Sequence, residues 1–316
     1  MPRTTMAWLL LLLAGLSVVQ VGCGGSTADT SSVPSDPFPV HVDHVFIVVL
    51  ENHSYEDIIG NTKDMPYLNN LATTYSYATS YYADSHPSLP NYFMLTTGQR
   101  IVNGVDEHPG AVTDDNVVRH LVAAGKTWKS YAESLPSAGY TGGDTGAYQE
   151  RFNPISYFSD VRDNTSESIN LVPFSQFDVD LANHALSDYS WIVPNEYDNA
   201  HSCPPDNPTC TDDQKLATAD AWLQTNLDPL IKSPDFNTPG GGLLIITFDE
   251  SEETDTAHGG GHVAWLAVGP DVKKGYTSSV LYQHESTLRL MLALIGIESF
   301  PGGAASAPDM REFLAN

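Results

Sequence analysis

The chain has 316 residues, and its 39 acidic side chains outnumber its 14 basic ones, giving a formal net charge of -25. Apolar residues make up 41% of the chain, which is too much for a disordered tail and enough for a buried core. The charge excludes nucleic acid as an expected partner, because phosphate backbones are bound by clustered Lys and Arg. An anionic substrate would need a bound cation to reverse the local field.

The first residues indicate export. Arg3 precedes an apolar run over residues 8–16 that is too short to span a bilayer comfortably. Cys23 after Gly22 resembles a lipobox, although Gln20 stands where Leu is usual, and ordinary cleavage nearby is the alternative. We therefore expect an export signal over residues 1–23, a periplasmic or cell-surface location, and a membrane attachment if Cys23 carries lipid.

Two further features suit an exported protein. Residues 24–42 are rich in Ser, Thr, Pro and Asp and lack an apolar period, so we expect a flexible tether before a single domain over residues 43–316. Cys203 and Cys210 lie in a Pro-rich stretch and form an even pair once Cys23 is set aside. They predict a local disulfide, since a thiolate metal site would need a second Cys pair or a His at zinc-finger spacing.

Apolar runs alternate with helical patterns from residue 44 onward. Buried, β-prone runs occupy residues 45–50, 189–193, 243–248 and 263–268, and helical spacing occupies residues 116–124, 212–232 and 279–297. The alternation predicts an α/β fold with a doubly wound, mainly parallel sheet flanked by helices. The loop-rich stretch over residues 134–175 is expected to be an insertion near a site.

Polar side chains stand beside each of these runs. They are Glu51 and Asn52 after the first, Asn195, Asp198 and His201 after the second, Asp249 and Glu250 after the third, and His258 and His262 before the fourth. A lone Asp or Asn after a strand is most often a turn residue or a helix cap. Because ligands bind beyond the carboxyl ends of parallel strands, four such groups together predict one crevice.

The nucleophile candidate is Ser88. Pro90 can open a helix that Gly98 closes, which would put Ser88 just before a helix N-terminus, where backbone amides favour negative charge. A phosphate held by Ser88 would suit that place. The alternative is a plain N-cap serine.

Five ordered motifs carry a family resemblance. They are Glu51-Asn52-His53-Ser54-Tyr55, Pro87-Ser88-Leu89-Pro90-Asn91-Tyr92 with Thr97-Gly98, Pro194-Asn195 to His201, Phe248-Asp249-Glu250 and Gly261-His262-Val263. Together they resemble the phosphoesterase family that contains bacterial acid phosphatases and phospholipases C, within the alkaline-phosphatase-like superfamily. The resemblance covers about residues 42–300.

The resemblance implies roles for particular residues. Ser88 would be the nucleophile and would bind a divalent metal ion together with Glu51, Asn52, Asp249 and Glu250. His201 and His262 would be catalytic, Asn91, Asp198 and His258 would bind substrate, and His284 occupies a place where the family often has His, a surface role being equally open. The oxygen-rich shell favours Mg, Ca, Mn or Fe over Zn, without deciding the metal.

These parts imply hydrolysis of a small phosphate ester through a phosphoserine, with imidazoles protonating the leaving oxygen. We expect a phosphomonoesterase of the acid phosphatase type, because the negative surface would be repelled by anionic membranes. A phospholipase C-type phosphodiesterase and a non-catalytic lipoprotein that binds a metal or a phosphate group are the alternatives. Gly-x-Ser-x-Gly, zincin and P-loop motifs are absent from the sequence. The oligomeric state stays open.

Overall fold

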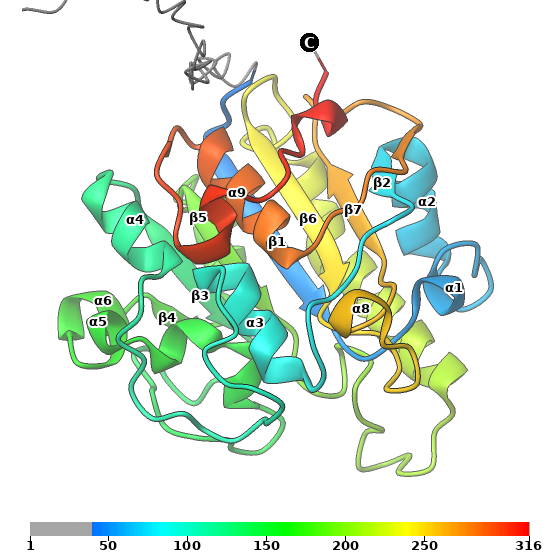
Figure 1. The fold of residues 1–316 in the computed structure, drawn as a ribbon, viewed down its shortest axis with the longest axis horizontal. Helices are drawn as coiled ribbons and strands as arrows, with labels where there is room; N and C mark the ends of the chain where they lie inside the picture. The colour runs from blue at the N-terminus through cyan, green and yellow to red at the C-terminus, as the bar shows by residue number, and fades with distance from the viewer. Residues whose placement is uncertain (1–39, 316) are drawn as a thin grey trace, which may run out of the picture. The chain divides into compact units, whose positions relative to one another are not determined.

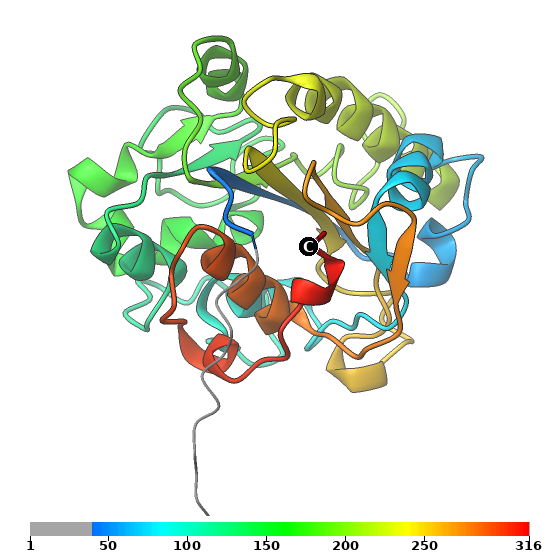
Figure 2. The same ribbon diagram turned by 90° about the horizontal axis from the view of Figure 1, so that it is seen from above.

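The computed structural model describes residues 40–315, so the expected export signal, Cys23 and most of the expected tether lie outside the described residues. Within this range an eight-stranded sheet runs through the domain in the order β4-β3-β5-β1-β6-β7-β2-β8 (Figures 1 and 2). Its strands are β1 (His44–Leu50), β2 (Ser76–Ala78), β3 (Trp128–Ala132), β4 (Leu171–Pro173), β5 (Tyr189–Val193), β6 (Gly242–Phe248), β7 (Trp265–Val268) and β8 (Tyr276–Ser278).

The centre of the sheet is parallel. Strand β1 lies between β5 and β6 and pairs in parallel with both, and all its residues after His44 are buried, as expected for a strand covered on both faces. Strand β7 is antiparallel to both of its neighbours, β6 and β2. The predicted α/β fold with a mainly parallel sheet is confirmed, as are the predicted strands that became β1, β5 and β6.

Helices cover both faces of the sheet. The α-helices are α1 (Tyr55–Ile58), α2 (Pro66–Thr74), α3 (Ser88–Thr97), α4 (Val117–Ala123), α5 (Ser159–Arg162), α6 (Thr165–Ser168), α7 (Ser175–Ala182), α8 (Asp212–Lys232) and α9 (His284–Leu294). Helices α3 and α9 pack against each other on one face, and α2 and α8 pack together on the other (Figure 2).

Two predicted boundaries need correction. The helix expected over residues 279–297 begins only at His284, because Tyr282 pairs with Tyr81 in a β-bridge and is therefore extended. The stretch over residues 134–175 is not simply a loop, since it contains α5, α6, β4 and the short 3-10 helices η1 (Glu150–Phe152) and η2 (Pro154–Tyr157). Both of these 3-10 helices pack against α3.

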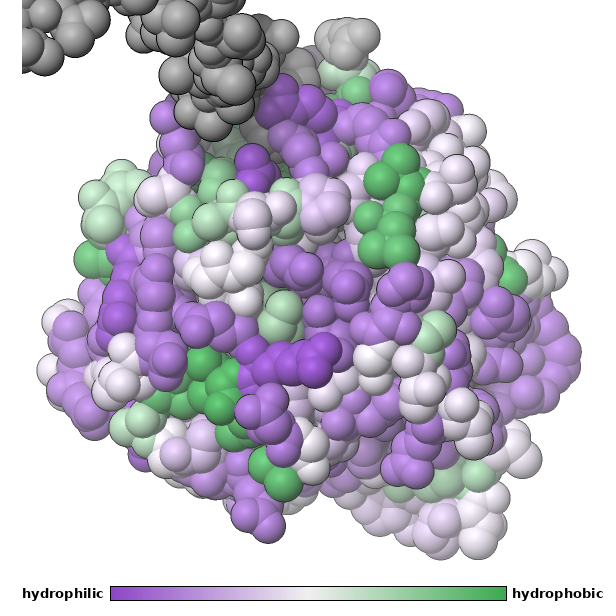
Figure 3. Space-filling view, in the orientation of Figure 1, coloured by the Kyte–Doolittle hydropathy of each residue, from purple (hydrophilic) through white to green (hydrophobic). Residues whose placement is uncertain are grey.

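One face of the molecule is mainly hydrophilic. The face seen in Figure 3 is mainly hydrophilic, with apolar side chains in small separate groups. Among the described residues, no helix combines the length and the apolar character needed to cross a membrane.

Candidate active site

Three carboxylates meet where β1 and β6 end. The two strands stay paired up to Leu50 and Phe248, so the residues that follow them, Glu51 and Asp249, leave the sheet side by side. The backbone N–H of Asn52 donates to Asp249 Oδ1 over 3.1 Å. The Asn52 side chain donates to Glu250 Oε1 over 3.0 Å. The sheet thus brings together four residues predicted to bind a metal, although nearly two hundred positions separate the two pairs.

Ser88 joins this cluster from α3. Its Oγ lies 3.1 Å from Glu51 Oε2 and 3.1 Å from Glu250 Oε1, and the residue is only 2% exposed. The helix begins at Ser88, two residues earlier than expected, so Ser88 lies in its first turn. Pro87 occupies the N-cap position, and the interpretation of Ser88 as a plain N-cap is therefore wrong. The hydroxyl is turned toward carboxylates from two strands.

The cluster carries more buried negative charge than its neighbours balance. Burial, and then the charge of Asp249, raises the pKa of Glu51 well above its usual value. The same two causes raise the pKa of Glu250 to about 9, and burial raises that of Asp249 to about 6. Buried Asp249 Oδ2 and Asn52 Oδ1 have no hydrogen-bond partner. Such a set of hard oxygen donors fits a divalent cation, which would satisfy these atoms and balance the charge.

These residues suit a divalent cation by the type of their donor atoms, but they are not arranged in a complete coordination geometry. Among residues 40–315, no three acidic, His or Cys side chains are already arranged as a ligand set.

His86 and Tyr92 complete the surroundings of these carboxylates. His86 Nδ1 lies 2.7 Å from Glu250 Oε2, and His86 Nε2 lies 2.8 Å from the carbonyl of Asp255. The Tyr92 hydroxyl donates to Glu51 Oε1 over 2.5 Å. We did not predict roles for either residue. Tyr92 could have been found from its position four residues after Ser88, which places both side chains on one helix face.

His201 lies in the loop after β5, beside Arg151. Its Nδ1 lies 2.9 Å from the Ser202 hydroxyl, and its Nε2 lies 3.5 Å from a guanidinium nitrogen of Arg151. Burial and the Arg151 charge lower the pKa of His201 to about 4, so its ring is neutral near pH 7. Arg151 belongs to η1, within the insertion expected near a site. Its positive charge offsets part of the rise in the pKa of Glu51. The sequence analysis did not single out this cation.

Asp198 lies in a separate acidic pair. Its Oδ2 accepts a hydrogen bond from Asn195 Nδ2 over 2.9 Å, and Glu133 Oε2 accepts one from the Asn195 backbone over 3.0 Å. Burial raises the pKa of Glu133 to about 7. The structure records no hydrogen bond between Asp198 and the Ser88 cluster among the described residues.

His258 and His262 lie in an aromatic group beside the cluster. The His262 ring stacks between Tyr55 and Tyr82, at centroid distances of 4.2 Å and 4.9 Å, and His258 lies 4.3 Å from Tyr82. Asp255 links this group to the reaction centre, because its side chain accepts the His262 backbone N–H and its carbonyl meets His86. Neither imidazole makes a hydrogen bond with Ser88 in the described part of the chain.

Asn91 and His284 are buried, and both side chains form hydrogen bonds with the backbone near the cluster. The Asn91 side chain accepts from the backbone N–H groups of Asp84 and Ser85 and donates to the Ser85 carbonyl, which fixes the turn before Ser88. His284 is 0% exposed, so the surface alternative for it is wrong. Its Nε2 lies 2.7 Å from the Asp249 carbonyl, and burial lowers its pKa to about 4. It therefore donates this hydrogen bond as a neutral ring.

Cys203 and Cys210 form the predicted disulfide. Cys203 and Cys210 are joined with an S–S distance of 2.00 Å and a Cα–Cα distance of 5.5 Å. They close the loop that leads from His201 to α8.

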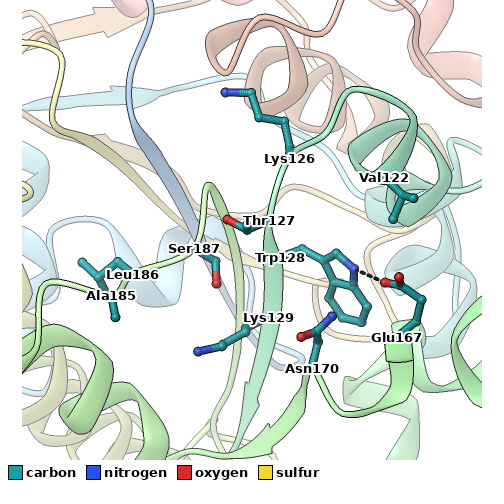
Figure 4. Close-up of a pocket in the computed structure, with 10 residues that line it drawn as sticks. All are labelled: Val122, Lys126, Thr127, Trp128, Lys129, Glu167, Asn170, Ala185, Leu186 and Ser187. Carbon is teal, nitrogen blue, oxygen red and sulfur yellow. Dashed lines mark hydrogen bonds between the residues drawn. The ribbon is translucent and has the colours of Figure 1, made fainter. Parts of the chain in front are cut away.

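A hollow of about 460 Å³ lies beside the first residues of β3, at the end of the sheet opposite to the carboxyl ends of its parallel strands. Figure 4 shows the indole N–H of Trp128 bonded to Glu167 there, with Lys126 and Lys129 on the other side. The amines of these two lysines are paired with Asp188 and Asp180. This hollow is remote from the carboxyl ends of β1 and β6 and takes no part in the site.

Comparisons with known proteins show which family the chain resembles. A model of the Phosphoesterase family matches residues 61–298. A phosphatidylinositol-3-phosphatase of Mycobacterium tuberculosis is 29% identical, over 94% of this chain and 87% of that protein. A probable acid phosphatase of Kluyveromyces lactis is 27% identical over 86% of this chain, and a phosphate-repressible acid phosphatase of Penicillium chrysogenum is 27% identical over 89%. The alignments span only 62% and 65% of these two fungal proteins.

Solved structures show the same fold. A protein of the alkaline phosphatase superfamily from Vibrio parahaemolyticus superposes with a TM-score of 0.57 at 14% identity, over 87% of this chain and 72% of that one. A lipoteichoic acid synthase from Listeria monocytogenes gives 0.57 at 12% identity, over 85% and 75%. At these identities the likeness concerns the fold alone.

Proposed function

The chain belongs to the Phosphoesterase family and is a phosphoric ester hydrolase, and from this premise we propose that it cleaves phosphate monoesters through a covalent intermediate on Ser88. The observation that carries the proposal is the position of the Ser88 hydroxyl, which lies 3.1 Å from carboxylate oxygens of both Glu51 and Glu250. A non-catalytic binding protein would not need a serine at this place.

The reaction has two displacements. Ser88 Oγ forms a bond to phosphorus as the bond to the leaving oxygen breaks. The hydroxyl proton passes to Glu51 or Glu250 in its ionised form, which can return it to the leaving oxygen so that an alcohol departs. Water then attacks the phosphoserine, and its phosphorus–Oγ bond breaks to release inorganic phosphate. Because His201 is neutral and lies beside Arg151, we propose that Arg151 binds the nonbridging phosphate oxygens while His201 orients the guanidinium.

We propose that Glu51, Asn52, Ser88, Asp249 and Glu250 hold a divalent cation. When bound, the cation would stabilise a Ser88 alkoxide and balance charge on the phosphoryl oxygens. The unpartnered oxygens of Asn52 and Asp249 support this assignment.

The substrate is proposed to be a soluble monoester. The excess of 25 negative charges opposes approach to an anionic lipid surface, and four relatives carry the name acid phosphatase without mention of a lipid. The relative named phosphatidylinositol-3-phosphatase is by its name also a phosphatase, and a lipid phosphate is the second substrate class that the kinetic comparison should include. We further propose that the protein is exported.

The experiment that tests the proposed function is phosphate release combined with trapping. The purified protein is expected to hydrolyse 4-nitrophenyl phosphate. Rapid acid quenching followed by peptide mass spectrometry should place a phosphate on Ser88. Turnover with the phosphate found on another side chain would overturn the assignment of Ser88.

A further inference from the structure

The segment after α3 brings a carboxylate back to the start of that helix. We call this segment, residues 100–111, the flap, and it contains no helix or strand. Asp106 lies in the flap, and its Oδ1 accepts a hydrogen bond of 2.8 Å from the backbone N–H of Leu89. Leu89 follows Ser88 directly, so Asp106 places a negative charge beside the candidate nucleophile.

The first turn of α3 has no cap of its own. Pro87 at the N-cap position makes no side-chain hydrogen bond, and Pro90 has no N–H. The helix therefore presents two donors that none of its own carbonyls accepts, the backbone N–H groups of Ser88 and Leu89. Asp106 accepts from Leu89, and the N–H of Ser88 has no recorded partner in the described part of the chain. Such donors bind anions, and a phosphate is the anion that the proposed reaction brings to Ser88.

The charge of Asp106 also reaches the reaction centre. Burial and the charge of Asp249 are the main causes that raise the pKa of Glu250, and the charge of Asp106 adds to them. Glu250 Oε1 lies 3.1 Å from Ser88 Oγ. A phosphate bound at Ser88 would therefore be repelled by Asp106 and would compete with it for the donors of α3.

The flap touches the rest of the domain at few places. Its first residues pack against the core, and its tip, residues 103–108, is exposed. No residue of the flap makes a backbone–backbone hydrogen bond within the part of the chain that the structure describes. Apart from Asp106, the tip is linked to the domain through His108, whose Nε2 lies 3.1 Å from Glu150 Oε2 and whose ring packs against Tyr157. The contact with α3 can therefore break without disrupting any backbone–backbone hydrogen bond of the flap.

We propose that the flap is an autoinhibitory element, in which Asp106 occupies a donor that the phosphate group needs, so that every substrate must displace it. This inference rests on the proposed function, because it requires a phosphate that binds beside Ser88. A phosphate monoester carries about two negative charges near pH 7 and three terminal oxygens that accept hydrogen bonds. Asp106 offers one charge, so the phosphate can replace it. The return of Asp106 after hydrolysis would in turn help to expel inorganic phosphate.

The first test measures binding of inorganic phosphate to the purified protein by isothermal titration calorimetry. We expect Asp106→Ala to bind phosphate about fivefold more tightly than the wild type, because a carboxylate that competes at a helix N-terminus is gone. Asp106→Asn keeps an acceptor oxygen but loses the charge, and it should also bind more tightly. Glu107→Ala is the matched control, since Glu107 is exposed in the same flap and no hydrogen bond of its side chain is recorded among residues 40–315. Its affinity should stay within about twofold of the wild type.

The second test follows the position of the flap without any turnover. A Glu-specific protease can cleave after Glu107, at the exposed tip. Saturating inorganic phosphate should speed this cleavage in the wild type, because the displaced flap is more accessible. Asp106→Ala should be cleaved fast with or without phosphate. Cleavage after Glu298, an exposed residue outside the flap, controls for effects of phosphate on the protease itself.

Several outcomes would overturn the inference. They are equal phosphate affinities in Asp106→Ala and Glu107→Ala, no phosphate binding in any of these proteins, and wild-type cleavage after Glu107 that does not respond to phosphate. Weaker phosphate binding in Asp106→Ala would also overturn it, since Asp106 would then support the site and not block it. If no ester at all is hydrolysed, the proposed function fails, and the calorimetric and proteolytic results still decide the role of the flap.

Discussion

Ser88 Oγ and Glu51 Oε2 lie 3.1 Å apart although 37 residues separate them in the chain. Strand β1 delivers the carboxylate and the first turn of α3 delivers the hydroxyl, so the contact depends on tertiary packing. Glu250 approaches the same hydroxyl from β6. The hydroxyl therefore lies between carboxyl groups that follow two neighbouring strands of the sheet.

Replacing Ser88 by Ala should reduce turnover of 4-nitrophenyl phosphate by several orders of magnitude, because the covalent step is lost. The fold should persist, since the change removes a single oxygen atom. Steady-state kinetics and circular dichroism measure the two effects, and Ser306→Ala, at an exposed site, is the control. Near wild-type activity in purified Ser88→Ala would refute the assignment.

Removal of divalent cations should abolish activity and change the stability of the protein. We expect elemental analysis to find one tightly held ion per chain, and Asp249→Asn to lower this content because Asp249 Oδ2 has no protein partner. Chelation should lower the thermal midpoint, since ligands that bind the native state stabilise it. Asp178→Asn, on the surface of α7, should retain the metal. A metal-free protein with full activity would reject the proposed ion.

Asp180 makes stability depend on pH, far from the active site. Burial alone would raise its pKa, but hydrogen bonds from Lys129, Gln176 and Tyr131 outweigh burial and lower it below its ordinary value of 3.8. A lowered native pKa contributes stability above pH 3.8, and that contribution is lost as the pH falls through the native pKa. Asp180→Asn should therefore cost about 1–3 kcal/mol at pH 7 and less in acid.

Urea unfolding of wild type and Asp180→Asn at several pH values between neutral and strongly acid measures this difference. The free-energy gap between the two proteins should narrow toward the acid end. Asp178→Asn, on the same helix but exposed, is the matched control. A gap that stays constant with pH would contradict the ionic role of Asp180.

Monoesters should be better substrates than phosphodiesters. A second ester group removes one negative charge from the phosphate and adds bulk beside the buried Ser88 hydroxyl. Comparing kcat/KM for 4-nitrophenyl phosphate with that for 4-nitrophenylphosphorylcholine on one preparation measures the preference. A clear preference for the diester would favour the phospholipase C alternative.

Lipid on Cys23 would attach the protein to a membrane. If it is lipidated, the protein partitions into detergent, because acyl chains contribute about 0.8 kcal/mol per buried methylene. Cys23→Ala should then move the protein to the aqueous phase. A wild-type protein that stays in the aqueous phase would point to ordinary cleavage of the signal, and detergent partitioning that persists in Cys23→Ala would contradict lipidation of Cys23.

Sequence patterns predicted the central sheet well, because β1, β5 and β6 are continuous apolar runs that are buried throughout. They missed β2, β4 and β8, which are three residues long and carry no period that can be measured, and they missed β3, where Lys129 and Ser130 interrupt the apolar pattern. The antiparallel direction of β7 was also not predicted. Strand direction depends on the path of the chain between strands, and no residue of β7 encodes it locally.

The candidate site was predicted where it follows strand ends and the Ser88 motif. The contacts of His86 and Arg151 were not predicted, because each depends on packing between loops distant in sequence. Asn91 was expected to bind substrate, yet its polar atoms bond to the backbone before Ser88. A motif identifies the residues that matter, but only the fold shows whether a side chain faces the substrate or holds the backbone.

Because β7 runs opposite to β6, residues 249–264 form a connecting loop that can vary without disturbing the sheet. Because β6 and β7 are antiparallel neighbours, with Thr247 opposite Trp265, the segment leaves the sheet and returns to it at the same end of the strands. Its exposed residues 252–254 can change in number at modest cost in loop-closure entropy, without shifting the register of either strand. It carries Glu250 at one end and His262 at the other. Exchanging its middle part between homologous enzymes would therefore alter what surrounds the reacting phosphate while the sheet stays unchanged.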